Sequence, residues 1–583
     1  MSERPTENPY ARLMALTQRA ATLVPMVGAR SIARTSGQEF SIVDTASVVS
    51  AFATSALHLA GKPAALAGFY QSVALNTLNA GWAFATRDSR SRNDRRFKGD
   101  AWDGAPVPRF AKEAHVALER ATEHLLSTLP EGSLAHLRTR FYTRQLLSIL
   151  APSNSAMINP AVLKKAMVSG GASLLDGFEN LLDDLDRGEG RLDLSNTDRD
   201  AFVVGRDLAT TPGKVVYQND LMQLIQYDPM TRSQNRRPML FVPAWINKYY
   251  ILDMRPDTSL VRYLVARGHT VFVISWVNPT AEHAGKSFED YMREGPLAAL
   301  DAIEQATGER EANILGFCIG GILVTATLAW LAAKGDDRIR SATTLASMID
   351  FTDVGEIGVF IDQNRVRALD AHMARSGYLE NYHLQDMFSM LRENDLVWSS
   401  HVNNYLMGER PSAFDLLFWN ADSTRLPRDM LLWYLNEIYL ANKLRQPGGL
   451  SLGGTPLDVA AIETPLFVLA TKDDHIAPWQ SVYPTTRLTG GPVEFVLGAS
   501  GHIAGVINPP KDKVKYGYWH SHTHPETPQG WLDSAGYSQA SWWGIWAEWL
   551  DAQGGTDQVP ARVPGDRALA VIEAAPGSYV AAP

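Results

Sequence analysis

A decapeptide near the middle of the chain constrains the fold more than any other stretch. Residues 312–321 (ANILGFCIGG) form an apolar run that ends in the pattern Gly-x-Cys-x-Gly, and the next ten residues are mostly apolar as well. This pattern predicts a buried strand, a sharp turn at Cys318 and a buried helix. The small residues on either side of the cysteine let the turn close. The turn would place the Ile319 N–H and the positive end of the helix beside the Cys318 sulfur.

Strand, sharp turn and helix in this order carry the nucleophile of α/β-hydrolases, where serine usually occupies the position of Cys318. A free cysteine at such a turn can also be a small buried hydrophobe. The order of other polar residues favours catalysis, because the acid and the histidine of this fold follow late strands in that order. Asp474 follows the apolar run 465–471, and His502 follows the run 493–497. We therefore expect an α/β-hydrolase fold with the triad Cys318, Asp474 and His502.

Two backbone N–H groups are candidates for an oxyanion hole. One belongs to Ile319, directly after the nucleophile. The other is expected in residues 243–248 (PAWINK), which follow an early apolar strand, and Ile246 is the candidate there. The neighbouring Trp245 could supply this N–H instead, or its side chain could simply anchor the loop by packing.

The pattern along the chain predicts two domains. Residues 1–200 have long amphipathic stretches and few strand-like runs, which predicts a mainly helical N-terminal domain. Strands and helices then alternate, so residues 201–583 are expected to form the α/β catalytic domain. From about 351 to 460 this alternation lapses into helical and irregular segments rich in aromatic residues. We interpret that segment as an inserted cap, which would exclude water and control access.

Composition excludes several classes of protein. A net charge of −9 argues against nucleic-acid binding, and the one cysteine excludes an intramolecular disulfide. The first residues lack a signal-peptide pattern, and no apolar run approaches the length of a transmembrane segment, so a cytoplasmic location is expected. Among the 14 histidines, residues 520–524 (HSHTH) are the one set with ligand-like spacing. We interpret them as a polar loop and expect no metal.

Several separate motifs together resemble those of polyhydroxyalkanoate (polyhydroxybutyrate) synthases. The likeness is highest with the class I enzymes, which act without a second type of subunit and prefer short hydroxyacyl-CoA thioesters. It is looser over residues 1–85, and Ile319 stands where valine is commoner. The motifs that carry the resemblance are residues 94–97, 159–160, 243–250, 316–321, 403–422, 474–479, 500–502 and 575–580.

The resemblance implies polymerisation of (R)-3-hydroxyacyl-CoA, with 3-hydroxybutyryl-CoA the expected substrate, and release of coenzyme A. Cys318 would take the acyl group from the thioester after His502 removes its proton. A 3-hydroxyl, rather than water, would then attack the acyl-cysteine with the help of a general base. Asp474 would orient His502 or act on the hydroxyl more directly. No cofactor is expected, since coenzyme A is part of the substrate and a released product.

Other interpretations remain open at this point. A cysteine-dependent thioesterase or esterase would have the same triad in a wetter site, and a synthase could prefer medium-chain hydroxyacyl-CoA. The intact triad argues against a non-catalytic granule-coating protein. The resemblance also implies a homodimer located at the surface of polyester granules, with granule-associated proteins as neighbours.

Overall fold

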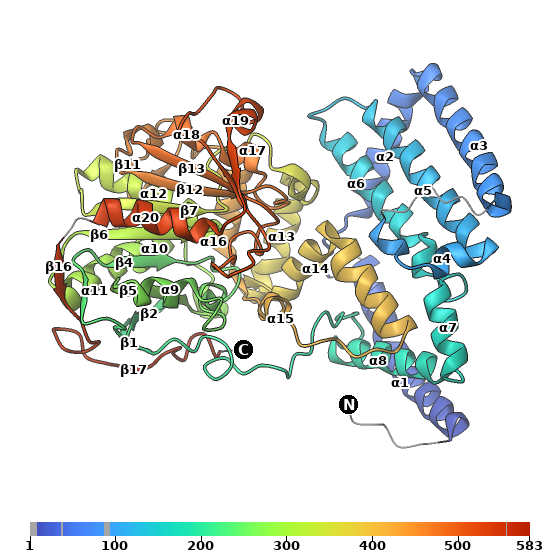
Figure 1. The fold of residues 1–583 in the computed structure, drawn as a ribbon, viewed down its shortest axis with the longest axis horizontal. Helices are drawn as coiled ribbons and strands as arrows, with labels where there is room; N and C mark the ends of the chain where they lie inside the picture. The colour runs from blue at the N-terminus through green and yellow to red at the C-terminus, as the bar shows by residue number, and fades with distance from the viewer. Residues whose placement is uncertain (1–7, 36–38, 87–93, 555–556, 583) are drawn as a thin grey trace. The chain divides into compact units, whose positions relative to one another are not determined.

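The chain folds as two compact units in a computed structural model that describes residues 8–35, 39–86, 94–554 and 557–582 (Figure 1). Unit 1 comprises Met1–Arg199 and Gln385–Phe414, and unit 2 comprises Asp200–Leu384 and Asp415–Pro583. The first division lies next to the expected domain boundary at residue 200. The segment 385–414 differs from the expectation, because it groups with unit 1 although the sequence placed it in the cap of the catalytic domain.

Unit 1 is helical, and its described residues contain no β-strand. Local signals begin its helices: Asn159, for example, accepts hydrogen bonds from the N–H groups of Ala161 and Val162, with Pro160 at the first helical position. Its α-helices are α1 Pro9–Thr35, α2 Thr45–Ala60, α3 Pro63–Thr86, α4 Ala101–Gly104, α5 Pro106–Ser127, α6 Leu134–Ile149, α7 Pro160–Val168 and α8 Ala172–Arg187. The second segment contributes most of α14 (Asn381–Leu391) and the π-helices η7 (Asn394–Trp398) and η8 (His401–Leu406).

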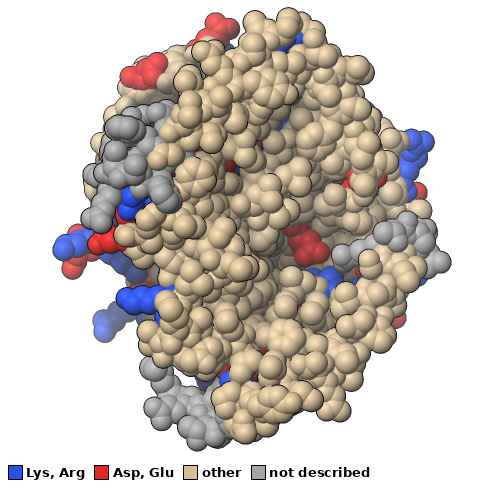
Figure 2. Space-filling model, turned by 90° about the vertical axis from the view of Figure 1, so that its right-hand side faces the viewer, with Lys and Arg blue, Asp and Glu red and all other residues tan. Residues whose placement is uncertain are grey.

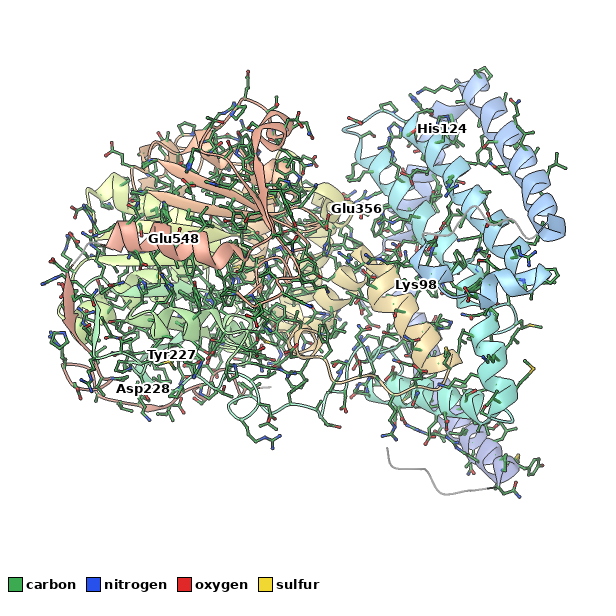
Figure 3. All side chains as sticks on the ribbon, in the orientation of Figure 1. Lys98, His124, Tyr227, Asp228, Glu356 and Glu548 are labelled. Carbon is green, nitrogen blue, oxygen red and sulfur yellow. The ribbon has the colours of Figure 1, made fainter. Side chains whose placement is uncertain are left out.

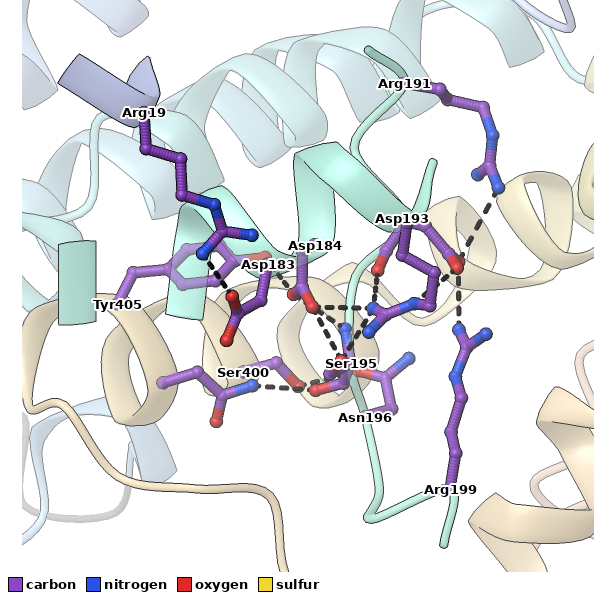
Figure 4. A network of polar contacts seen from close by, with 12 residues as sticks. Arg19, Asp183, Asp184, Arg191, Asp193, Ser195, Asn196, Arg199, Ser400 and Tyr405 are labelled. Carbon is purple, nitrogen blue, oxygen red and sulfur yellow. Dashed lines mark hydrogen bonds and ion pairs between the residues drawn. The ribbon is translucent and has the colours of Figure 1, made fainter. Parts of the chain in front are cut away.

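A buried polar network explains why residues 385–414 belong to unit 1 (Figure 4). Asp184 of α8 is 3% exposed and accepts hydrogen bonds from Arg187, from the Ser195 N–H and hydroxyl, and from the Tyr405 hydroxyl of η8. Asn404, the neighbour of Tyr405, donates to the Ser195 carbonyl at 2.7 Å. A buried carboxylate is tolerated only when it is hydrogen-bonded or paired, so η8 is needed to complete the surroundings of Asp184.

Unit 2 is built on an 11-stranded mixed sheet with the order β15-β14-β13-β12-β7-β6-β4-β5-β2-β1-β17. The strands from β13 to β5 run parallel, whereas those at both ends pair antiparallel. The strands are β1 Gly213–Gln218, β2 Met222–Tyr227, β4 Met239–Val242, β5 Val271–Trp276, β6 Ala312–Phe317, β7 Ile339–Leu345, β12 Leu466–Thr471, β13 Val493–Gly498, β14 Tyr518–His520, β15 Gly536–Ser538 and β17 Glu573–Ala574.

Helices pack on both faces of this sheet, which is why β5, β6 and β12 are buried along their whole length. The α-helices of unit 2 are α9 Leu260–Ala266, α10 Phe288–Met292, α11 Ala298–Thr307, α12 Ile319–Lys334, α13 Gln363–Ser376, α15 Asp415–Ala421, α16 Arg428–Trp433, α17 Trp479–Val482, α18 Thr485–Leu488, α19 Pro528–Ser534 and α20 Trp542–Gly554. Short strand pairs are β3 (Ser233–Asn235) with β16 (Gln558–Pro560), β8 (Tyr378–Leu379) with β9 (Leu426–Pro427), and β10 (Ser451–Leu452) with β11 (Thr455–Pro456).

This arrangement confirms the α/β-hydrolase fold and the strands that the sequence predicted around Cys318, Asp474 and His502. The C-terminal tryptophans pack as expected on the catalytic unit, because α20 buries Trp542 and Trp546, and the Trp546 indole donates to Thr343 of β7 at 2.9 Å. No helix among the described residues is both long and apolar enough to cross a membrane.

A buried acid lies beside the end of β2. The hydroxyl of Tyr227, labelled in Figure 3, donates to Asp253 at 3.4 Å. The hydroxyls of Thr211 and Ser259 donate to the other carboxyl oxygen. Burial nevertheless raises the pKa of Asp253 to about 6, because three neutral donors do not replace the water that the carboxylate loses.

Candidate active site

Cys318 occupies the sharp turn between β6 and α12, as predicted. Its φ of 55° and ψ of −125° are a strained conformation for a residue with a side chain. The flanking glycines are required by close approach: a Cβ on Gly316 would lie 2.5 Å from the Gly321 Cα, and one on Gly320 would lie 2.2 Å from the Val242 carbonyl oxygen. The turn leaves the cysteine half-buried at the carboxyl ends of the parallel strands.

Asp474 and His502 follow the neighbouring strands β12 and β13 and are hydrogen-bonded to each other. The His502 Nδ1 lies 2.7 Å from Oδ2 of Asp474. The N–H groups of Ile476 and Ala477 donate to Oδ1 at 2.9 Å each. Burial raises the pKa of Asp474, but the nearby His502 charge and these hydrogen bonds outweigh burial, so its pKa lies below the usual value.

The ring of His502 connects Asp474 with Cys318. Burial alone would lower the pKa of His502, but the charges of Asp474 and Cys318 and hydrogen bonds to both raise it well above its usual value. Because Nδ1 is taken by Asp474, Nε2 is the nitrogen that serves Cys318. The structure therefore brings together the three side chains that the sequence singled out, from the ends of β6, β12 and β13.

Helix α20 supports the loop that carries His502. The indole of Trp542 donates to the Gly505 carbonyl at 3.0 Å, and the indole of Trp543 donates to the Val506 carbonyl at 3.0 Å. Both indoles are buried. The loop after β13 is thus tied to α20 at Gly505 and Val506, a few residues after His502, which keeps the His502 ring in place.

The two expected oxyanion donors lie in different local surroundings. Ile319 is the first residue of α12, so its N–H has no acceptor within the helix. Ile246 lies in the loop after β4, between two carbonyls that are held by side chains: the Thr424 hydroxyl donates to Trp245, and the Trp419 indole donates to Lys248 at 2.7 Å. The Trp245 side chain itself is buried against other aromatic rings, namely Trp276, Phe288 and Tyr291, which is the packing role.

An ion pair also holds this loop, and sequence reasoning missed it. The Lys248 ammonium lies 2.8 Å from one carboxyl oxygen of Asp422, and the Tyr250 hydroxyl donates to the other at 2.9 Å. Lys248 is 8% exposed, and Asp422 supplies the opposite charge beside its ammonium group. Lys248 lies in the motif 243–250 and Asp422 in the motif 403–422, and both motifs contributed to the family resemblance. Nothing in the local sequence of either motif indicates that the two residues meet.

Two tyrosines of the cap were missed as well. Tyr434 and Tyr439 lie one turn apart on the π-helix η9 (Tyr434–Leu440), with ring centroids 5.3 Å apart. Burial is the largest cause that raises the pKa of Tyr434, and the charges of Tyr439 and Cys318 raise it further. The pKa of Tyr439 is raised by burial and then by the charge of Cys318. Both rings are therefore near the nucleophile. A π-helical turn has no reliable sequence signal, although such turns are frequent at functional sites.

The described residues contain two groups of potential metal ligands, and both lie outside the Cys318, Asp474 and His502 cluster. Within the described residues, three His, Asp or Glu ligand atoms come within 4.8 Å of one another at two places, His372 with Glu380 and His383, and Glu494 with His520 and His522. Neither group includes Cys318, Asp474 or His502.

Two family models match the chain in agreement with this architecture. Residues 93–264 match the family described as the poly-beta-hydroxybutyrate polymerase (PhaC) N-terminus, and residues 237–509 match the alpha/beta hydrolase fold. A monoacylglycerol lipase from Paleococcus ferrophilus is 14% identical with a TM-score of 0.31, covering 57% of this chain and 99% of its own.

Sequence relatives are much closer. A poly(3-hydroxyalkanoate) polymerase from Methylorubrum extorquens is 46% identical over 84% of this chain and 80% of its own. The poly(3-hydroxyalkanoate) polymerase subunit PhaC of Cupriavidus necator is 42% identical over 84% of this chain and 83% of its own. The chain belongs to the poly(3-hydroxyalkanoate) polymerase family.

Proposed function

We propose that this chain polymerises (R)-3-hydroxyacyl-CoA, with 3-hydroxybutyryl-CoA as its substrate, through an acyl group carried on Cys318. The observation that carries the proposal is the 2.7 Å contact between His502 and Asp474, with Cys318 as the second partner of the same ring. The family membership gives the class of reaction, and this geometry supports the covalent route.

In the first half-reaction, His502 Nε2 takes the proton of the Cys318 thiol. The thiolate attacks the thioester carbonyl, and the N–H groups of Ile319 and Ile246 are the proposed donors to the resulting oxyanion. Collapse of this intermediate breaks the bond to the coenzyme A sulfur, which leaves with the proton held by His502. Coenzyme A is thus a product, and the acyl group remains on Cys318.

In the second half-reaction, a 3-hydroxyl attacks an acyl-cysteine and loses its proton to His502. This forms an ester, lengthens the chain by one unit and returns the Cys318 sulfur, which regains the proton. The hydrogen bond from His502 to Asp474 favours the role in which Asp474 orients His502 and stabilises the imidazolium. Direct action of Asp474 on the hydroxyl is less well supported, since both of its oxygens already accept hydrogen bonds.

Polymerisation requires that the hydroxyl compete with water. Tyr434 is buried, and Phe351 packs edge-on against Tyr439 with ring centroids 4.9 Å apart. Tyr434 and Tyr439 near Cys318, with Phe351 packed behind Tyr439, support a dry site and favour the synthase over the thioesterase alternative.

The test is to supply the purified chain with 3-hydroxybutyryl-CoA and follow coenzyme A release and turbidity. Release with growing turbidity is expected, and Cys318→Ala should abolish both, whereas Glu282→Ala, an exposed change, should leave both intact. Release with only soluble 3-hydroxybutyrate would overturn the proposal in favour of a thioesterase. Turnover only with longer hydroxyacyl chains would favour the medium-chain alternative.

We also infer that unit 1 contacts the polyester, so that the enzyme acts at the surface of a polyester granule in the cytoplasm. We infer further that it acts there as a homodimer, with granule-associated proteins as neighbours. Large apolar side chains of consecutive segments are exposed, including Leu150, Met157, Met167 and Val168. Charged side chains are sparse on the face of unit 1 turned to the viewer in Figure 2. Such a surface suits an apolar polymer or a second copy. Failure of the chain to sediment with its polymer, or a monomeric mass during synthesis, would contradict the inference.

A further inference from the structure

The histidine-rich segment 520–524 lies where the sheet of unit 2 brings a carboxylate beside it. β14 ends at His520 and pairs antiparallel with β13 in the register Val496 with His520. Extending this register by two residues on each strand places Glu494 opposite His522. Alternate residues of a strand share one face, so the pairing predicts that Glu494, His520 and His522 gather on the same side of the sheet edge.

The observed contacts agree with this placement. His520 Nε2 is hydrogen-bonded to Oε1 of Glu494, and Nδ1 of His522 lies 3.7 Å from the same oxygen. The two rings are nearly perpendicular, with centroids 4.6 Å apart. One ligand atom from each residue lies within 4.8 Å of the other two.

These separations are close to those of a tetrahedral metal site. Ligand bonds of about 2.0–2.1 Å place neighbouring donor atoms about 3.4 Å apart, so small side-chain movements would complete the geometry. The adjustment would be inexpensive, since the His522 side chain is 84% exposed and free to rotate. Glu494 and His520, which are mostly buried, would form the fixed part of the site.

A fourth nitrogen lies in the same segment, outside the group of three ligand atoms that are within 4.8 Å of one another, so its side chain would have to move to join them. The Nε2 of His524 is buried and has no hydrogen-bond partner in the described part of the chain. The His524 side chain interacts electrostatically with Glu494, His520 and His522. A buried imidazole nitrogen without a partner is costly, and a metal ion would satisfy it.

We propose that Glu494, His520 and His522, with His524 as the fourth ligand, form a binding site for a divalent transition metal of the Zn²⁺ type. Three imidazoles and one carboxylate suit Zn²⁺, Co²⁺ or Ni²⁺, whereas Ca²⁺ and Mg²⁺ prefer sets made of oxygen. The interpretation of HSHTH as a polar loop did not include Glu494, which arrives from another strand.

The site would have a structural effect near the proposed active site without taking part in its chemistry. A metal bound by both strands would join β13 to β14, and the loop between these strands carries His502. Because binding favours only the folded state, the metal should raise the unfolding temperature of unit 2.

The experiment uses the full chain without a polyhistidine tag, freed of metal with a chelator and then titrated with Zn²⁺ by calorimetry and with Co²⁺ by visible absorption. One metal per chain, tetrahedral Co²⁺ bands and a higher unfolding temperature are expected. The variant His520→Ala/His522→Ala should bind at least about tenfold more weakly. His124→Ala, which removes an exposed histidine of α5, should bind as the unchanged chain does.

Absence of saturable binding would overturn the proposal. Unchanged metal affinity in His520→Ala/His522→Ala would also overturn it. In that case, loss of binding in His372→Ala would assign the metal to the group of His372, Glu380 and His383 instead. Circular dichroism of the double variant, compared with that of the unchanged metal-free chain, separates loss of ligands from loss of folding.

Discussion

His502 donates to Asp474 across 2.7 Å, although the two residues follow different strands and lie 28 positions apart in the chain. The contact exists because β12 and β13 run parallel, in the register Leu466 with Val493, so that their carboxyl ends meet at one edge of the sheet. Cys318 reaches the same edge from β6. The register of the sheet therefore sets the geometry of the proposed triad. Substitutions that alter the triad and substitutions that alter the sheet should have different effects in experiments.

Replacing Asp474 with asparagine should lower the pKa of His502, because the carboxylate is what offsets the effect of burial on this ring. We expect coenzyme A release to slow by roughly 10³- to 10⁴-fold. A protonated His502 stabilises the fold below its ordinary pKa, and this contribution is lost as pH rises through the raised value. The loss of stability in Asp474→Asn should thus be largest from about pH 4 to 6 and shrink at higher pH. Ring resonances of His502 and denaturation, both followed from about pH 4 to well above the ordinary pKa of histidine, provide the measurement, and an unchanged His502 pKa would contradict the expectation.

Substitution of Gly320 by alanine should destabilise unit 2, since the new Cβ would lie 2.2 Å from the Val242 carbonyl oxygen. We expect a cost of about 1–3 kcal/mol in the free energy of unfolding, because the backbone of the turn or of Val242 must move to relieve the clash. Gly544→Ala in α20 is the matched control: its Cβ meets no atom within 4 Å, and alanine favours a helix. Urea denaturation of both variants checks this, and equal stabilities would show that the turn can relax.

Removing the Asp422 carboxylate as Asp422→Ala should leave the buried Lys248 ammonium without its partner. We expect a destabilisation of about 1–3 kcal/mol, allowing for the partial exposure of Asp422. Because the loop carries Ile246, kcat should fall more than KM rises. The exposed pair of Asp257 with Lys511 is the control, and Asp257→Ala should cost about 0.5 kcal/mol or less. A destabilised Asp422→Ala with unchanged kcat would remove this loop from the proposed oxyanion hole.

Asp253 should make the stability of unit 2 depend on pH. Its pKa is raised from 3.8 to about 6 in the folded chain, so folding binds a proton between these values. Stability from this group is present at low pH and falls as pH rises from about 4 to 6, by about 3 kcal/mol in total. Asp253→Asn should remove that slope, so its stability relative to the unchanged chain should increase over the same range. Urea denaturation at several pH values tests this, and parallel pH profiles would refute it.

The candidate site was predictable from the sequence where local patterns carry the information. The apolar run before Cys318 and the glycines around it determine a strand, a tight turn and a helix, because no larger residue fits at Gly316 or Gly320. That Cys318, Asp474 and His502 each follow a strand, in this order, could also be predicted from local patterns. Apolar runs long enough to form buried strands can be identified without knowing their partners.

Contacts between distant segments could not be predicted in this way. The sequence places residues 385–414 in the cap, but Asp184 of α8 requires Tyr405 as a hydrogen-bond partner, so that segment joins unit 1. The pairing of Lys248 with Asp422 likewise depends on how the cap folds back on the loop after β4.

The sequence by itself determined the strands, the turn at Cys318 and the family, since these depend on residues that are neighbours in the chain. Only the tertiary structure decided that Tyr434 and Tyr439 approach Cys318 and that Glu494 joins the histidines of residues 520–524. Burial, charge pairing and hydrogen bonding act between atoms that are close in space, and a buried polar group must find its partner wherever the packed chain brings one.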